Sequence, residues 1–331
     1  MSPEPAGWLD LVHEEVLLPD LAICDPHHHL WDHPNERYLV DELHQDTGSG
    51  HKVMTTVYVD CMSGYRTDGP EELRPVGETE FALGQSRASE AGGAVIGAIV
   101  SYADLRLGAG VEAVLAAHVA AGDGRFRGIR HATARDADPS IRSNHVGSPA
   151  GLMGTPAFRE GLGVLAAMGL SYDAWLYHPQ LVELAAAARA VPDFVIILDH
   201  LGGPLGIGPY QDRDAALQDW RASMADVATC ENVFLKLGGI GMPAFGIAWH
   251  KRERPPTSAE LAATWGDEIR FAIDAFGPSR CMFESNFPVD RKGCSYPVLW
   301  NAFKRMAESY SPAEQQWLFH NTAATAYGLA N

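Results

Sequence analysis

The chain has 331 residues, of which 46% are hydrophobic and 20% are charged, a composition that supports a large folded core and argues against disorder. Its 42 acidic residues outnumber its 25 basic residues, and the formal net charge is -17. The overall field therefore repels phosphate backbones and anionic lipid, so neither nucleic acid nor a membrane surface is expected as a partner. A few arginines in a cleft would still accept an anionic small molecule.

The cysteines and the N-terminal segment both bear on where in the cell the protein is found. The five cysteines are scattered and show no C-x-x-C spacing, which indicates a reduced, cytoplasmic protein. Residues 1–20 lack a basic start and carry acids through their apolar part, so they are interpreted as an N-terminal extension and not as a signal peptide. No run approaches the ~18 apolar residues that a membrane span needs.

Short runs of β-type sequence alternate with helical segments along the rest of the chain. Eight runs are apolar on both faces, as parallel strands are: 21–27, 55–61, 94–100, 126–131, 170–176, 194–200, 232–238 and 281–287. The segments between them are rich in alanine and leucine at helical spacing. Eight strands alternating with helices predict an α/β fold of the (β/α)8 TIM-type barrel class, formed by one domain over 21–331. A doubly wound sheet is the alternative.

In such a barrel the chemistry lies at the carboxyl ends of the strands and in the loops that follow them. The first strand ends in "ICDPHHHLWDH". Strand alternation places His27 and His29 on one face with Asp25 one step deeper, while His28 points away. Two imidazoles converging in this way fit one cation of the zinc or manganese type. Histidines that are only hydrogen-bonded in a polar barrel mouth are the other interpretation.

Two later strands end in further polar groups. His200 ends the sixth strand in "ILDHLGGP", where alternation turns Asp199 away from the site and makes it a structural anchor. Glu284 and Asn286, in "MFESNFPVD", are two residues apart and are expected to face the barrel interior together.

Aromatic residues follow the fifth strand. Trp175 and Tyr177 share a face in "YDAWLYHPQL" and are expected to line the substrate pocket, with the Tyr177 phenol as a donor.

Taken together, these motifs resemble those of the amidohydrolase superfamily. The resemblance runs from about residue 20 to the C-terminus, through the D-x-H-x-H end of the first strand, "RFRGIRH", "YDAWLYHPQL", "ILDHLGGP", "NVFLKLGG", "MFESNFPVD" and "LFHNTAATAYGL". More narrowly, the chain is similar to the branch of sugar-acid lactonases and 2-pyrone-4,6-dicarboxylate lactonase.

The resemblance implies a water molecule activated near His27, His29 and His200 that attacks a lactone or ester carbonyl. Relatives carry an aspartate at the eighth strand as the base, and the aligned residue here is Asn286, whose amide cannot accept that proton. We expect Glu284 to supply the carboxylate instead. The alternative is that Glu284 pairs with an interior cation, for which Lys236 is a candidate.

The resemblance also bears on the metal and on the substrate. A metal, if bound, would be one divalent ion, zinc or manganese, held by His27, His29, His200 and Glu284; metal-free operation is the other possibility. Arg130 and Arg127 look like the substrate-binding clamp of the branch, because guanidinium groups bind carboxylates in a bidentate manner. The two arginines are three residues apart, so only one can face the pocket, and Arg130 is the choice.

The sequence thus predicts a cytoplasmic hydrolase that opens a lactone or cyclic ester of a small, carboxylate-bearing organic acid. A non-oxidative decarboxylase or carbon–carbon hydrolase of an aromatic or dienoic acid is the first alternative, and a catalytically silent barrel that binds a small acid is the second. A small-molecule substrate is the expected partner, and barrels of this kind also form homodimers.

Overall fold

A computed structural model describes residues 7–34, 36–143 and 147–329 of the chain. The first six residues of the expected N-terminal extension and the last two residues of the expected domain lie outside the described residues. Eight parallel strands form one sheet: β1 (Ala22–His28), β4 (Lys52–Val59), β5 (Val95–Ser101), β6 (Phe126–Arg130), β7 (Ser171–Ala174), β8 (Ile196–Leu198), β9 (Val233–Leu237) and β10 (Cys281–Phe283).

The sheet curls into a barrel. Its strands are hydrogen-bonded in chain order from β1 to β10. At the seam, His28 forms a parallel bridge with Phe287, and the His29 N–H donates to the Phe287 carbonyl over 2.8 Å. The predicted (β/α)8 barrel is confirmed, because an open doubly wound sheet would have reversed its strand order and kept two free edges.

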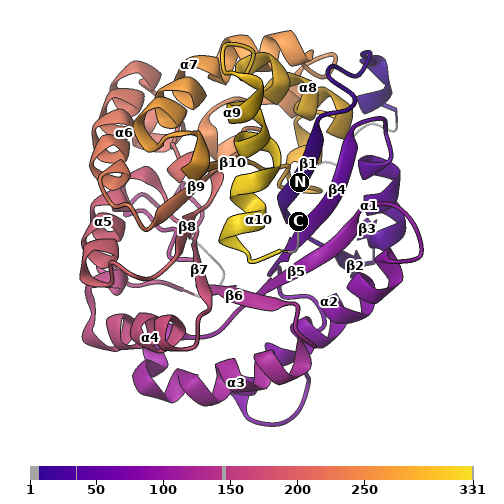
Figure 1. Ribbon diagram of the computed structural model, residues 1–331. Helices are drawn as coiled ribbons and strands as arrows, with labels where there is room; N and C mark the ends of the chain where they lie inside the picture. The colour runs from indigo at the N-terminus through magenta and orange to yellow at the C-terminus, as the bar shows by residue number, and fades with distance from the viewer. Residues whose placement is uncertain (1–6, 35, 144–146, 330–331) are drawn as a thin grey trace.

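Helices surround the barrel in Figure 1. They are α1 (Val40–Thr47), α2 (Val76–Ser89), α3 (Val111–Ala121), α4 (Pro156–Ala167), α5 (Leu181–Ala190), α6 (Arg213–Ala228), α7 (Ser258–Phe276), α8 (Tyr296–Met306), α9 (Pro312–Gln316) and α10 (Thr322–Ala326). Local sequence defines their ends: the Thr257 hydroxyl accepts from the Glu260 N–H, and the Glu260 carboxylate accepts from the Thr257 N–H, which fixes the start of α7. A hairpin that was not predicted, β2 (Trp31–His33) with β3 (Glu36–Tyr38), follows β1.

Apolar side chains fill two regions. The larger lies between the strands and the helices, and it contains the fully buried rings of Trp220, Trp265 and Trp300. The smaller fills the barrel itself and includes Cys24, Val57, Val100, Ile197 and Met282. These side chains form a packed core inside the barrel.

Helix α10 closes one end of the barrel. Figure 1 shows it across the opening that the strands surround. Tyr327, just after α10, packs in the inner core, and its hydroxyl donates to Asp173 Oδ2 over 2.6 Å. Leu329 lies next to Gly97 near the start of β5, so this is the amino-terminal end of the strands. The opposite, carboxyl-terminal end carries the polar residues described below.

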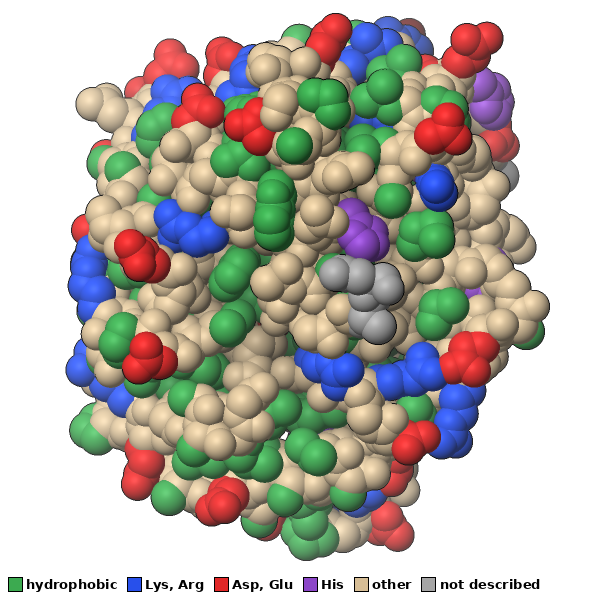
Figure 2. Space-filling model, in the orientation of Figure 1, with side chains coloured by type: hydrophobic (Ala, Val, Ile, Leu, Met, Phe, Trp, Pro, Cys, Tyr) green, Lys and Arg blue, Asp and Glu red, His purple; other side chains and the backbone are tan. Residues whose placement is uncertain are grey.

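The charge of the chain is not gathered by sign on the face shown in Figure 2, where acidic and basic side chains are interspersed. Within the described ranges, no helix combines the length and the apolar character that crossing a membrane requires.

Candidate active site

The histidine run at the end of β1 is shaped by an irregularity in the strand. Asp25 is paired with Thr56 of β4, but His28 is paired with Tyr58, so β1 contains one more residue than its partner over this stretch. The extra residue reverses the side-chain alternation. His27 therefore points into the barrel and His28 points outward to the Thr56 hydroxyl at 2.9 Å, as predicted for His28.

The prediction for Asp25 is wrong for the same reason. Its carboxylate lies on the outer side of the strand, where it accepts from the Ser285 N–H and the Tyr296 hydroxyl, each over 3.0 Å. Burial raises the pKa of Asp25 to about 6. Asp25 thus ties β1 to the segment after β10 and to α8, and it does not enter the site.

His27 and His29 meet at the mouth of the barrel. Their Nε2 atoms are 3.3 Å apart, and His29 Nδ1 lies 2.9 Å from the Val59 carbonyl oxygen. A carbonyl can only accept, so His29 carries its proton on Nδ1 and presents the Nε2 lone pair to His27. Burial lowers the pKa of both imidazoles, which favours the neutral form that binds a metal.

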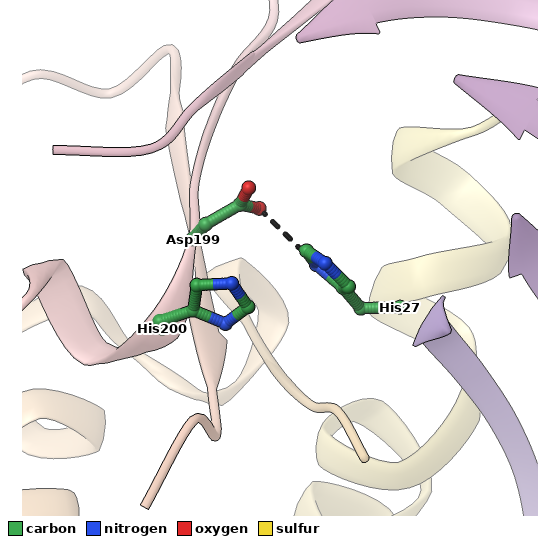
Figure 3. Close-up of side chains that lie close together, drawn as sticks. All are labelled: His27, Asp199 and His200. Atoms are coloured by element: carbon green, nitrogen blue, oxygen red, sulfur yellow. Dashed lines mark ion pairs between the residues drawn. The ribbon is translucent and has the colours of Figure 1, made fainter. Parts of the chain in front are cut away.

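His200 and Asp199 follow β8, where the backbone leaves the strand conformation. Asp199 is extended, but His200 has φ 53 and Leu201 φ 54, both in the left-handed region. Strand alternation does not apply to such a turn. Asp199 consequently faces the same space as His200 and His27, and ligand atoms of these three residues lie within 4.8 Å of one another (Figure 3). The predicted outward position of Asp199 is wrong.

Glu284 lies between His200 and His27 and contacts both. Its Oε1 lies 2.7 Å from His200 Nδ1 and accepts from the His200 N–H over 3.0 Å, while Oε2 lies 2.9 Å from His27 Nδ1. Burial raises the pKa of Glu284, but the neighbouring imidazoles of His200 and His27 outweigh it and hold the pKa at about 2. A Cβ at position 238 would collide with Glu284, which explains the first glycine after β9.

Two buried cations flank His27. Arg130 Nη1 is 3.2 Å from His27 Nε2, and Lys236 Nζ is 3.1 Å from His27 Nδ1. Arg130 pairs with Asp60 over 2.5 Å and Lys236 pairs with Asp173 over 2.7 Å.

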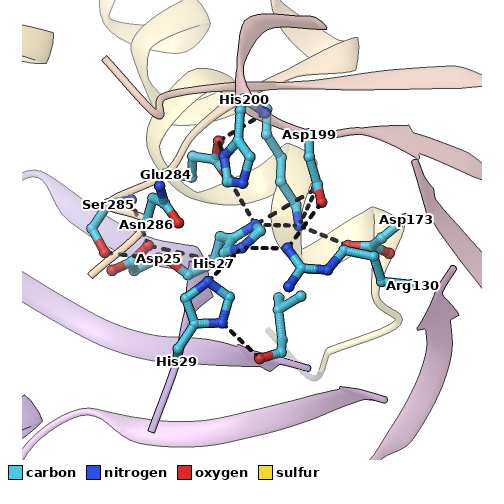
Figure 4. Close-up of polar contacts among 12 residues, drawn as sticks. Asp25, His27, His29, Arg130, Asp173, Asp199, His200, Glu284, Ser285 and Asn286 are labelled. Carbon is cyan, nitrogen blue, oxygen red and sulfur yellow. Dashed lines mark hydrogen bonds and ion pairs between the residues drawn. The ribbon is translucent and has the colours of Figure 1, made fainter. Parts of the chain in front are cut away.

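Asp199 lies between these cations, 2.9 Å from Lys236 Nζ and 3.6 Å from Arg130 Nη1. Burial raises its pKa, but the charges of Lys236 and His27 hold that pKa well below its ordinary value. Both of its carboxylate oxygens lack a hydrogen bond within the described part of the chain. Figure 4 shows Asp173, Asp199 and Arg130 converging on the side of His27 that faces away from Asn286.

Asn286 occupies the position of the missing aspartate, but its amide turns toward a later residue. Its φ of 54 is left-handed, and its Nδ2 donates to Asp290 Oδ1 over 2.9 Å. The other Asp290 oxygen accepts from the Gly241 N–H over 2.9 Å. Burial raises the pKa of Asp290 to about 7. Asp290 was not predicted, and its only sequence signal is its place four residues after Asn286.

The predicted substrate-binding residues fall into different places. Trp175 is half-buried, with its ring 4.7 Å from the His200 ring, so it lines the site. The Tyr177 hydroxyl donates to the Arg142 carbonyl over 2.7 Å, and Tyr177 packs with Trp175 at its edge. Arg127 binds carbonyl oxygens of Gly124, Phe126 and Tyr327 near the amino-terminal end of the barrel, far along the strand from the mouth.

The donor set fits one divalent metal ion. Two Nε2 atoms 3.3 Å apart match the separation of roughly 3.4 Å that tetrahedral zinc with Zn–N bonds of about 2.05 Å imposes. The charges point the same way, because the buried carboxylates of Asp60, Asp173, Asp199 and Glu284 exceed the buried cations Arg130 and Lys236 by two. Uncompensated buried charge is costly, and a divalent ion removes this excess.

An eight-stranded parallel barrel with imidazoles and carboxylates at the carboxyl ends of its strands is the architecture of a hydrolase-type barrel enzyme. The amidohydrolase family profile matches residues 24–329, and the chain belongs to that family. The resemblance to the lactonase branch is confirmed by curated relatives. The chain is 29% identical to an L-fucono-1,5-lactonase of Burkholderia multivorans, over 92% of this chain and 95% of that protein.

Two further comparisons support the family. A protein of Sinorhizobium fredii, named uncharacterized protein y4mH, is 33% identical over 94% of this chain and 99% of its own length. A crystal structure of an amidohydrolase from Burkholderia multivorans with bound zinc is 27% identical, has a TM-score of 0.72, and covers 93% of this chain and all of its own. The chain is therefore an enzyme of the hydrolase type.

Proposed function

We propose that this enzyme hydrolyses the lactone of a small sugar acid or related hydroxy acid at the carboxyl-terminal mouth of its barrel. The observation that carries the proposal is the gathering of ligand atoms of His27, His200 and Asp199 within 4.8 Å of one another. His29 Nε2 lies 3.3 Å from His27 Nε2, and Glu284 contacts both His27 and His200. The likeness to the fuconolactonase supports the substrate class. The zinc in the related crystal structure supports a metal centre.

His200 and His29 each present one ring nitrogen as a ligand in this proposal. Glu284 holds the His200 proton on Nδ1, so His200 presents Nε2 as a lone-pair donor. His29 presents its own Nε2 because Val59 holds the other nitrogen. A divalent ion bound by these imidazoles, with Asp199 as a further ligand, would supply Lewis acidity toward the carbonyl and a water of lowered pKa. Trp175 would cover His200 and limit the access of bulk water.

The charge of the centre bears on which lactone fits. Arg130 is only 7% exposed and is already committed to the Asp60 side chain and to the Asp60 carbonyl. A guanidinium neutralised in this way is a weak clamp for a substrate carboxylate. The excess of buried carboxylates also disfavours an incoming anion. We therefore propose a neutral sugar-acid lactone, whose carboxylate arises only on ring opening, over a lactone that already carries carboxylates.

A substrate panel tests the proposal. Purified enzyme, assayed after loading with Zn²⁺ or Mn²⁺ and after chelation, would be offered sugar-acid lactones, 2-pyrone-4,6-dicarboxylate and carboxylated phenols, with acid release followed by a pH indicator. Turnover of neutral lactones that is lost in His200→Asn is the expected result. Carbon dioxide release from a phenolic acid without lactone turnover would instead favour the decarboxylase alternative and overturn the proposal.

A further inference from the structure

The buried lysine of β9 has surroundings that resemble those of a metal ion. Lys236 is fully buried inside the barrel. Its Nζ lies 2.7 Å from Asp173 Oδ2, 2.9 Å from Asp199 Oδ1 and 3.1 Å from His27 Nδ1. Two carboxylate oxygens and one imidazole nitrogen are a common donor set for zinc or manganese, and here they surround an ammonium group.

The ligand set belongs to three different strands or strand ends. Asp173 comes from β7, Asp199 follows β8, and His27 comes from β1. Figure 4 shows the carboxyl groups of Asp173 and Asp199 on the same side of the His27 ring. Lysine reaches this point from β9 because its long side chain spans the barrel interior. The Tyr327 ring lies under it, 5.5 Å from Nζ, and its hydroxyl holds Asp173.

The centre therefore has two sides. On the mouth side, His29 Nε2 lies beside His27 Nε2 and His200 lies above them. On the interior side, Lys236 already places one positive charge between Asp173 and Asp199. An ammonium ion and a divalent ion cannot occupy the same place, and bringing them close together costs Coulomb energy in a poorly screened interior.

We propose that Lys236 is a built-in cation that fills a second metal position and thereby confines any divalent ion of this enzyme to the mouth side of His27. The inference deepens the metal centre of the proposed function. Its test measures ion binding and not turnover. Failure to open lactones would therefore overturn the proposed function without affecting this test, and an unexpected ion stoichiometry would overturn the inference without affecting the lactone assay.

The Lys236→Ala variant tests the proposal directly. It removes the ammonium group and opens space between the three donors, so it should bind one more equivalent of Mn²⁺ than the wild type, whatever the wild-type stoichiometry. Ion binding would be measured by titration of chelator-treated protein and by elemental analysis after gel filtration. Added Mn²⁺ should also raise the melting temperature of Lys236→Ala more than that of the wild type, because an ion that binds the folded state stabilises it.

Two variants serve as matched controls. Lys236→Met removes the charge but fills the space, so it should gain no ion. Lys304 is another buried lysine, and its Nζ contacts His51 Nδ1 at 2.8 Å and the carbonyl oxygens of Leu17 and Leu18. Among the described residues none places a carboxylate at this Nζ, so Lys304→Ala should keep the wild-type stoichiometry.

Equal stoichiometry in Lys236→Ala and the wild type would overturn the proposal, as would an extra ion in Lys236→Met. If Lys236→Ala does not fold, wild-type crystals grown with excess Mn²⁺ decide the matter through anomalous scattering. The proposal requires any ion to lie on the mouth side, away from Asp173. An ion bound to Asp173 with the lysine displaced would refute it.

Discussion

Replacing Glu284 by glutamine is the most informative test of the site. The carboxylate contacts a histidine on each side: Oε1 accepts from His200 Nδ1 and from the His200 backbone N–H, and Oε2 forms an ion pair with His27 Nδ1. The backbone N–H of His200 can only donate, so the side-chain oxygen of the glutamine must stay next to His200. Its NH2 group then faces His27 Nδ1, where it can only donate, and the ion pair between Oε2 and His27 is lost.

The magnitude follows from the bonds affected. One charge-assisted hydrogen bond contributes about 1.5 to 3 kcal/mol, and each 1.4 kcal/mol corresponds to about tenfold, so kcat/KM should fall roughly 10- to 100-fold. Loss of such a carboxylate behind a ligating histidine typically weakens metal binding by a similar factor, about 10- to 100-fold. Glu284→Asp keeps the charge and should lose less.

The assay has two parts. Lactone turnover gives kcat/KM, and ¹⁵N spectra of the histidines report which ring nitrogen carries the proton. We expect His200 to stay protonated on Nδ1 in Glu284→Gln while His27 changes. Wild-type turnover together with unchanged histidine tautomers would refute the reasoning that Glu284 is a positioning residue. That Glu284 acts as the base stays a prediction, and its Oε1 is already bound to the ring and the backbone of His200.

Three other predictions concern stability. Burial, together with the charge of Asp60, raises the pKa of Glu78 to about 8, so the folded state keeps a proton that the unfolded chain releases near pH 4.5, and stability should fall as pH rises between these values. Glu78→Gln keeps the acceptor for Cys61, Ser63 and Tyr58, so its melting temperature should exceed that of the wild type increasingly from pH 5 to 8.5; parallel pH profiles would contradict this. Tyr327→Phe removes the hydrogen bond to buried Asp173 and should lower the free energy of unfolding in urea by about 1 to 3 kcal/mol. The control Tyr310→Phe loses an exposed bond to Asp274 and should lose only about 0.5 kcal/mol. Equal losses in the two variants would argue against the interior role of Tyr327. Thr56→Val leaves His28 Nε2 without its partner and should cost about 1 to 2 kcal/mol of unfolding free energy while kcat/KM stays within about twofold, and a large loss of turnover would mean that His28 belongs to the site.

The sequence predicts the barrel well because strand composition and helix spacing are local signals. Each of the eight predicted runs overlaps an observed strand, and the rings of His27 and His200, from the first and sixth predicted strands, lie 4.4 Å apart at the mouth. The errors lie where the backbone departs from a regular strand. The extra residue between Asp25 and His28 reverses alternation, and the left-handed turn at His200 brings Asp199 inward. Neither feature has a signature in the composition of the segment.

Charge pairing across the barrel is likewise invisible in sequence. Lys236 was considered as a partner of Glu284, but the structure pairs it with Asp173 and Asp199 and gives Glu284 to the histidines. Lys236 and Asp199 are 37 positions apart, and His200 and Glu284 are 84 positions apart, so residue spacing cannot predict these contacts. Arg130 was correctly placed at the mouth, but its neutralisation by Asp60 depends on a residue of another strand end.

The closure of the barrel by α10 has a consequence for biosynthesis. Phe287, which closes the barrel against His28, is made about 260 residues after it, and Tyr327 is made about 300 residues after His27. The first strands therefore leave the ribosome long before the segment against which they close, and the barrel cannot close until the segment with Phe287 has emerged. Chaperone capture of nascent chains should persist until then.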